Sequence, residues 1–112
     1  MCTKNQLECI VKEVAQHAKN TFGKQLDNVI LYGSYARGDY TCESDIDIMV
    51  IVSDSPEVLK KHTRSFCVLS SNLGLEYDVV VSVTIKDAET FNKYADVLPF
   101  YKNVLKEGVF VA

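Results

Sequence analysis

Residues 30–50 read Ile-Leu-Tyr-Gly-Ser-Tyr-Ala-Arg-Gly-Asp-Tyr-Thr-Cys-Glu-Ser-Asp-Ile-Asp-Ile-Met-Val. Two apolar runs flank a polar loop that opens with Gly33-Ser34, which predicts a strand, a tight loop and a second strand. Successive side chains of a strand alternate between its faces, so Asp45 and Asp47 are expected on one face, roughly 6.6 Å apart along the backbone. Two carboxylates this close repel each other, and the stretch therefore predicts one or two divalent cations between them.

The first half of the loop carries groups that suit a phosphate. Gly33 has no Cβ, so the backbone can turn sharply and a ligand can come close. Ser34 offers a hydroxyl and Arg37 a guanidinium, and a helical turn from Ser34 to Arg37 would present a positive N-terminus. We therefore expect one half of the site to bind metal and the other half to bind the phosphates of a nucleoside triphosphate.

The pattern of Gly33-Ser34, a ten-residue spacer and Asp45-Ile46-Asp47 resembles the signature of the DNA polymerase beta-like nucleotidyltransferases. The length of 112 residues is similar to that of the minimal nucleotidyltransferases of this superfamily. The resemblance implies an α/β fold, the polymerase-beta-like nucleotidyltransferase palm, with a small mixed sheet flanked by helices. It also implies two Mg²⁺ ions as cofactors and ATP as the nucleotide donor.

A third carboxylate is expected from a neighbouring strand. Residues 76–83 predict that strand, and Asp78 resembles the carboxylate that the family supplies before an apolar run. Glu76 lies on the same face by strand alternation and is the alternative, whereas a solvent-facing residue at a strand end is the structural interpretation of either. The resemblance thus implies catalytic and metal-binding roles for Asp45, Asp47 and Asp78, and nucleotide binding by Gly33, Ser34 and Arg37.

The acceptor of the nucleotide is implied only by the resemblance. Many minimal nucleotidyltransferases are paired with a HEPN-domain toxin and act as its antitoxin by transferring AMP to a tyrosine of the toxin. Two alternatives stay open at this point: nucleotidyl transfer to a small-molecule hydroxyl held by a separate subunit, and a non-catalytic antitoxin that neutralises its partner by contact. The sequence leaves a homo-oligomer or a hetero-oligomer equally open.

Composition narrows the setting of this chemistry. A net charge of −3 lacks the basic footprint of a nucleic-acid binder, so we expect no direct DNA binding. No apolar stretch is as long as a membrane span, and the four cysteines form no Cys-x-x-Cys pair, so a cytoplasmic protein with free thiols is expected. The length fits one domain over residues 1–112.

The remaining elements follow from periodicity and capping signals. Thr3 and Gln6 resemble a capping box, and a strand is expected from Asn28 to Gly33. An apolar tail over residues 109–111 predicts an edge strand or a subunit contact. The predicted helices run from about Lys4 to Asn20, from Ser55-Pro56 to about Asn72 with Gly74 ending it, and from Asp87 onward, kinked or split at Pro99, with Phe91, Tyr94, Leu98, Tyr101 and Leu105 buried.

Overall fold

The computed structural model describes residues 3–41 and 43–111. A four-stranded mixed sheet in the order β3-β2-β1-β4 forms its centre, with β2 antiparallel to β1 and parallel to β3, and β4 antiparallel to β1. The elements along the chain are α1 Lys4–Phe22, the 3₁₀ helix η1 Gly23–Gln25, β1 Leu26–Tyr32, α2 Ser34–Arg37, β2 Ile46–Val52, α3 Pro56–Tyr77, β3 Val81–Asp87, α4 Ala88–Tyr94, α5 Pro99–Glu107 and β4 Val109–Phe110.

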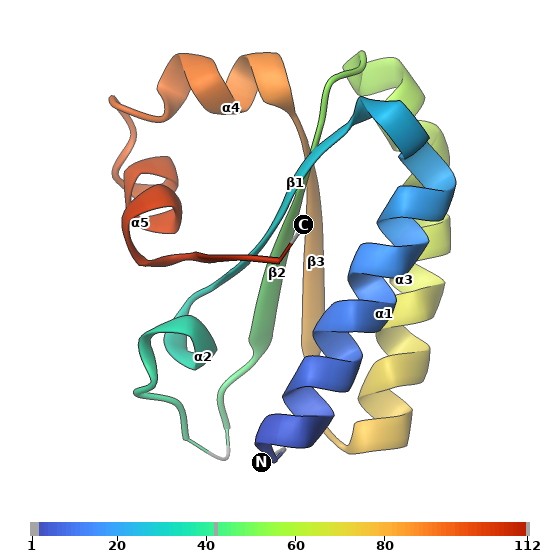
Figure 1. Ribbon diagram of the computed structural model, residues 1–112, viewed down its shortest axis with the longest axis vertical. Helices are drawn as coiled ribbons and strands as arrows, with labels where there is room; N and C mark the ends of the chain where they lie inside the picture. The colour runs from blue at the N-terminus through green and yellow to red at the C-terminus, as the bar shows by residue number, and fades with distance from the viewer. Residues whose placement is uncertain (1–2, 42, 112) are drawn as a thin grey trace.

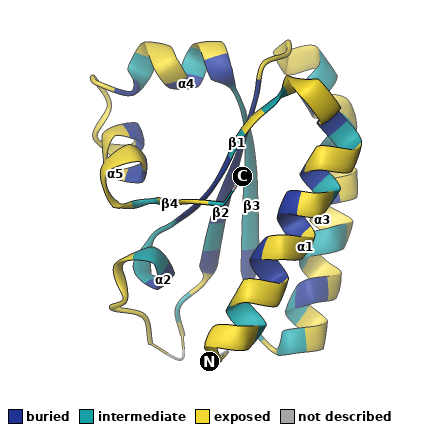
Figure 2. Ribbon diagram, in the orientation of Figure 1, coloured by how far each residue is buried: buried dark blue, intermediate teal, exposed yellow. Residues whose placement is uncertain are grey.

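Helices cover both faces of the sheet, which confirms the predicted α/β class. Figure 1 shows α1 and α3 on one face and α4 and α5 on the other, with α2 beside the lower end of the strands. Strand β2 is the centre of the packing: Ile48 and Val50 point into the core beneath α1 and α3, and Met49 and Ile51 into the core beneath α4 and α5. Figure 2 shows this strand buried and the outer surfaces of the helices exposed.

Helix α1 begins as the sequence predicts. Gln6 N–H donates to Thr3 Oγ1 while Thr3 N–H donates to Gln6 Oε1, which completes the capping box. Gly23 follows the helix with a φ of 56°. Cys9 and Cys67 are free thiols, as expected, whereas Cys2 and Cys42 lie outside the described residues. Across the described ranges, the length and apolarity that a bilayer crossing requires are not met by any helix.

The end of α3 corrects the sequence prediction. Glu76 belongs to the helix, and Asp78 follows it with a φ of 53°, so the third strand begins at Val81 and not at Glu76. Gly74 lies inside the helix, and its carbonyl accepts the N–H groups of Asp78 and Val79. A Cβ on Gly74 would lie 2.8 Å from the Val79 carbonyl oxygen, so this glycine makes room for the returning chain instead of ending the helix.

Pro99 splits the last helical segment, as one of the two predicted outcomes. Asp87 Oδ2 accepts the N–H of Thr90 as the N-cap of α4, and Pro99 is the first residue of α5. The split breaks the single apolar face that was expected: Leu98 and Leu105 are exposed, and Val104 is buried instead. The tail forms the edge strand β4, paired with Ile30 and Leu31 of β1.

Candidate active site

The pairing of β1 with β2 brings Gly33 against Asp47. Tyr32 and Asp47 are opposite each other in this antiparallel pair, and Gly33 follows with a φ of 78° and a ψ of −159°. A Cβ built on Gly33 would lie 2.5 Å from Asp47 Oδ2, closer than real Cβ atoms come. This backbone conformation and this contact both require glycine, so the carboxylate of Asp47 lies directly over the turn.

Asp45 and Asp47 form a pair of carboxylates that accept no hydrogen bond from the described residues. Asp47 is half-buried in β2, and Asp45 is exposed just before the strand begins. Burial raises the pKa of the Asp47 carboxyl, the nearby Asp45 carboxylate raises it further, and Arg37 opposes both effects. Within the described residues, neither carboxylate accepts a hydrogen bond or forms an ion pair. Such a pair favours a cation, which would relieve both the repulsion and the burial cost.

The four-residue helix α2 places Ser34 beside this pair. The N–H groups of Ala36 and Arg37 both donate to the carbonyl oxygen of Gly33 at 3.1 Å. These two amides are therefore used inside the turn, and the helix N-terminus offers fewer donors than the sequence prediction assumed. The hydroxyl of Ser34, which is half-buried, is the side-chain donor that this turn contributes.

Arg37 links α2 to α5 at the edge of the site. Its Nε donates to Asp39 Oδ2 at 3.2 Å, and its Nη1 donates to Glu107 Oε2 at 3.3 Å. The hydrogen bonds that Arg37 donates to Asp39 and Glu107 raise the pKa of the guanidinium, which is charged at any physiological pH. Arg37, which the sequence predicts to bind phosphate, thus lies near Asp47 but is already paired with two carboxylates.

Asp78 lies at the same end of the sheet but outside the carboxylate pair. It is exposed at the end of α3, and the described residues contain no group of three His, Cys, Asp or Glu side chains arranged to hold a metal. Two residues later, the carbonyl of Val80 accepts the N–H of Ile46 at 2.9 Å, which ties this segment to the residue after Asp45. Glu76 lies in the last turn of α3 and is exposed.

Tyr32 is a site residue that the sequence analysis missed. It faces the same side of the sheet as Asp47, and its ring meets Phe100 of α5 edge-on at 5.7 Å between centroids. Burial raises the pKa of its hydroxyl, a hydrogen bond with Thr84 opposes this, and Asp47 adds to it. Strand alternation places Tyr32 on a face, but only the strand register reveals that it lies opposite Asp47, and that register is not encoded locally.

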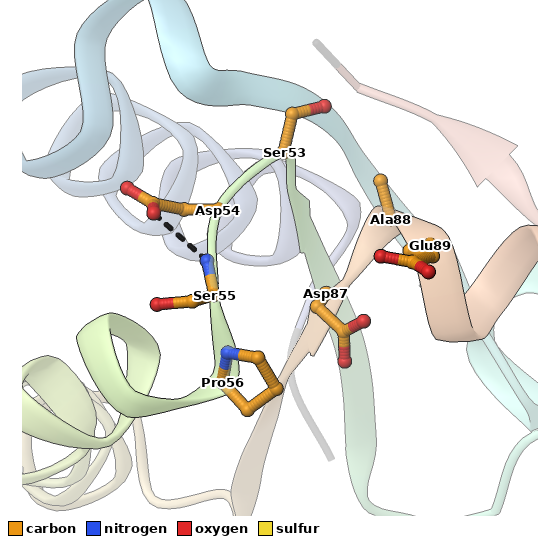
Figure 3. Close-up of a pocket in the computed structure, with 7 residues that line it drawn as sticks. All are labelled: Ser53, Asp54, Ser55, Pro56, Asp87, Ala88 and Glu89. Atoms are coloured by element: carbon orange, nitrogen blue, oxygen red, sulfur yellow. Dashed lines mark hydrogen bonds between the residues drawn. The ribbon is translucent and has the colours of Figure 1, made fainter.

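A second cavity lies at the far end of the sheet, where β2 and β3 lead into α3 and α4 (Figure 3). It holds about 460 Å³, against about 210 Å³ for the pocket beside Gly33. Asp54 and Asp87 line it, and both accept backbone N–H groups, from Ser55 at 2.8 Å and Thr90 at 2.9 Å. Both aspartates of the larger cavity therefore already accept backbone N–H groups, whereas Glu89, which also lines it, accepts none among the described residues.

Comparisons with known proteins give the family of this chain. The model of the family described as Nucleotidyltransferase domain matches residues 9–111. A Methanocaldococcus jannaschii protein provisionally named a protein adenylyltransferase is 38% identical over 101 residues, 90% of this chain and 93% of that protein. Protein adenylyltransferase MntA of Thermococcus cleftensis is 29% identical over 111 residues, 99% of this chain and 98% of that protein.

Structural comparison gives the same fold. This chain is similar to a chain in the complex of a tri-AMPylated Shewanella oneidensis HEPN toxin with an MNT antitoxin. The TM-score is 0.51 at 17% identity, and the match covers 93% of this chain and 70% of that chain. A likeness at this level of identity shows the fold alone.

Proposed function

This chain belongs to the nucleotidyltransferase domain family and is a nucleotidyltransferase, and from this premise we propose that it transfers AMP from ATP to a tyrosine of a HEPN-domain toxin, as the antitoxin of that toxin. The acceptor oxygen forms a bond to the α-phosphorus, the bond to the β-phosphate breaks, pyrophosphate leaves, and the hydroxyl proton goes to solvent. The full-length similarity to protein adenylyltransferase MntA supports the reaction, and the AMPylated HEPN toxin in the similar complex supports the acceptor.

The observation that carries the proposal is the contact between Gly33 and Asp47. It holds a half-buried carboxylate over the turn that leads to Ser34, with Asp45 beside it and no donor from the described residues to either. A purely structural role would leave both charges uncompensated at a cost to stability. A reaction on phosphates bound to a cation gives this arrangement a purpose.

The donor set fits Mg²⁺. The carboxylate oxygens of Asp45 and Asp47 are hard ligands, and no described His or Cys side chain joins them in a group that could hold a metal. Two Mg²⁺ ions, when bound, neutralise charge on the triphosphate and acidify the attacking hydroxyl. Asp45 and Asp47 would hold them, and the cations would offset the burial of the Asp47 carboxylate.

Asp78 stays in the proposal as the third carboxylate. Its segment is anchored beside Asp45 through the hydrogen bond between Ile46 and Val80, and two residues span at most about 7 Å. Glu76 lies inside α3, farther along the chain from Val80 than Asp78 is, and is the weaker alternative. The variants Asp78→Asn and Glu76→Gln separate the two alternatives. Only the variant that loses a metal ligand is expected to change how the rate of transfer depends on the Mg²⁺ concentration.

Ser34 and Arg37 are proposed to bind the phosphates. The Ser34 hydroxyl donates to a phosphate oxygen, and the bare backbone of Gly33 lets that phosphate come close. Arg37 would exchange Asp39 and Glu107 for the phosphates, since a more highly charged anion competes well for a guanidinium at an exposed site. Both groups would stabilise the charge that develops on pyrophosphate as it leaves.

The test is a label-transfer experiment with the purified chain, Mg²⁺ and a HEPN-domain protein encoded beside its own gene. ATP labelled at the α-phosphate is expected to label the partner, and ATP labelled at the γ-phosphate is not. Replacing the acceptor tyrosine of the partner by phenylalanine should abolish labelling. Transfer of the γ-label, labelling of small molecules alone, or neutralisation of the toxin without any labelling would each contradict the proposal.

A further inference from the structure

We infer that the pocket between β1 and α5 binds the base of the nucleotide, with Phe100 as the stacking surface and Asn103 as the group that selects adenine. This inference rests on the proposed function, because it assigns the part of the nucleotide that the carboxylates and Ser34 do not contact. The pocket is lined by these two residues together with Tyr32, Gly33, Arg37, Val104 and Glu107.

The position of the pocket connects it to the reaction site. Gly33 forms part of its wall and at the same time contacts the carboxylate of Asp47. The pocket holds about 210 Å³, below the roughly 300–1,000 Å³ that is usual for a whole small-molecule ligand. It is therefore sized for one part of the nucleotide, while the phosphates lie over the Gly33 turn.

The chemistry of the walls separates a base from a phosphate. Phe100, Asn103 and Val104 lie at i, i+3 and i+4 of α5, so one face of this helix is turned toward β1. Two aromatic rings and a valine face the pocket, and once Arg37 turns to the phosphates, as proposed above, the charged group left in its wall is the carboxylate of Glu107. Aromatic rings beside a carboxylate favour a planar ring over an anion.

Phe100 is exposed to solvent although its ring contacts two other aromatic rings. It is 51% exposed, although its ring meets both Tyr32 and Tyr101 edge-on, at 5.7 Å and 5.4 Å between centroids. These edge-on contacts hold the ring in place and leave ring surface free for a ligand. A base that stacks there would cover apolar surface that is otherwise left in water.

Asn103 supplies the selectivity. Its exposed side-chain amide has both a donor and an acceptor, which match the acceptor N7 and the donor N6 amino group of adenine. Guanine presents two acceptors at the corresponding edge, so the amide oxygen would face another acceptor. The side chain should therefore favour ATP over GTP.

The experiment measures the binding of a non-hydrolysable ATP analogue and of inorganic tripolyphosphate, each with Mg²⁺, by calorimetry. Phe100→Leu is expected to weaken the ATP analogue at least about fivefold and to leave tripolyphosphate unchanged, with affinity regained in Phe100→Tyr. Asn103→Ala should reduce the preference for the ATP analogue over its GTP counterpart, also at least about fivefold. Leu105→Ala, an exposed apolar residue of the same helix outside this pocket, is the matched control and should change neither.

Several results would overturn the inference. An unchanged affinity for the ATP analogue in Phe100→Leu excludes stacking, and an equal loss for tripolyphosphate means that the ring acts on the fold. A lower rate of transfer at saturating ATP with unchanged nucleotide affinity would place the acceptor side chain in the pocket instead of the base. If the unmodified chain binds neither ligand, both this inference and the proposed function are wrong. If it binds the ATP analogue and the pocket variants bind it equally well, only this inference is wrong.

Discussion

Both ends of the sheet carry aspartates, but these aspartates differ in whether they accept hydrogen bonds. At the far end, Asp87 and Asp54 accept backbone N–H groups and Asp27 accepts the hydroxyl of Ser53 at 2.7 Å. At the Gly33 end, the described residues give Asp45 and Asp47 no donor. Acidic residues therefore mark both ends, but of these aspartates only Asp45 and Asp47 lack a donor within the described residues.

The pKa shifts follow the same division. Burial by itself raises the pKa of Asp87, but the hydrogen bonds from Thr90, with help from Lys86, bring it below its ordinary value. Burial also raises the pKa of Asp47, and there Asp45 adds to the rise. The larger cavity lies at the far end, so the proposed site rests on the state of the carboxylates and not on the size of the cavity.

The first test neutralises one carboxylate at each end of the sheet. Asp47→Asn is expected to lower AMP transfer at least about 100-fold, because under the proposed mechanism it removes a direct metal ligand, and loss of even an outer partner costs about 10–100-fold. Asp54→Asn is the matched control at the far end and should leave transfer unchanged. The measurement is label transfer from ATP at equal concentrations of folded protein; similar losses in the two variants would remove the distinction between the ends.

A second test separates the contact at Gly33 from its backbone conformation. Gly33→Ala should lower the free energy of unfolding by about 2 kcal/mol and impair transfer, since the new Cβ would strike Asp47 Oδ2 in a conformation open almost only to glycine. Gly38→Ala is the control: its φ is 87°, and a Cβ there meets nothing within 4 Å, so only about 1 kcal/mol of backbone strain is expected.

Denaturant unfolding of both variants, with and without Asp47→Ala, gives the coupling between positions 33 and 47. A loss that is the same in the two glycine variants, or no coupling with position 47, would mean that the contact contributes nothing.

The Gly33 end was the easier half to predict from sequence because its features are local. Strand alternation predicts Asp45 and Asp47 on one face, although β2 begins at Ile46, so only Asp47 lies in the strand and Asp45 directly precedes it. Gly33 is set by the turn that follows β1. Asp78 was harder, because residues 74–80 fit either a glycine-ended helix followed by a strand or a helix that runs on beneath the returning chain. Gly74 favours the first interpretation by type, and only its contact with Val79 reveals the second.

The residues that the sequence did not reveal depend on distant pairing. Tyr32 is a site residue because the β1–β2 register places it opposite Asp47, and Phe100 because α5 packs back over β1. The expected burial of Leu98 and Leu105 failed for the same reason, since Pro99 restarts the helix at a new angle and its apolar face shifts to Val104. Packing between elements far apart in the chain decides these positions, and periodicity within one element does not.

The caps at the far end predict a smaller, purely structural effect. Asp87→Ala should lower the free energy of unfolding by about 1 kcal/mol, because the N–H of Thr90 loses its acceptor at the start of α4. Glu89→Ala, in the same first turn but without a capping bond, should cost a few tenths of that, from its interaction with the helix dipole. Denaturant unfolding measures both, and label transfer should be unaffected in either; a loss of transfer by folded Asp87→Ala would give the far end a functional role.

The smallest expected effect is the opposite pH dependence of the two ends, measured by denaturant unfolding in EDTA. The raised pKa of Asp47 means that ionisation is unfavourable in the fold, so this carboxyl costs stability as pH rises from its ordinary pKa, about 3.9, through its folded value. Asp47→Asn should therefore be more stable than the parent at pH 7, with the gain vanishing at low pH.

The lowered pKa of Asp87 predicts the opposite pH dependence of stability. Its ionised form stabilises the fold above about pH 3.9, and this stabilisation is lost as pH falls through the folded pKa. Asp87→Asn, which can still cap α4, should be less stable at pH 7 and equal to the parent at low pH. Shifts of the same sign would show that the two ends do not differ in electrostatics, whatever their roles in transfer.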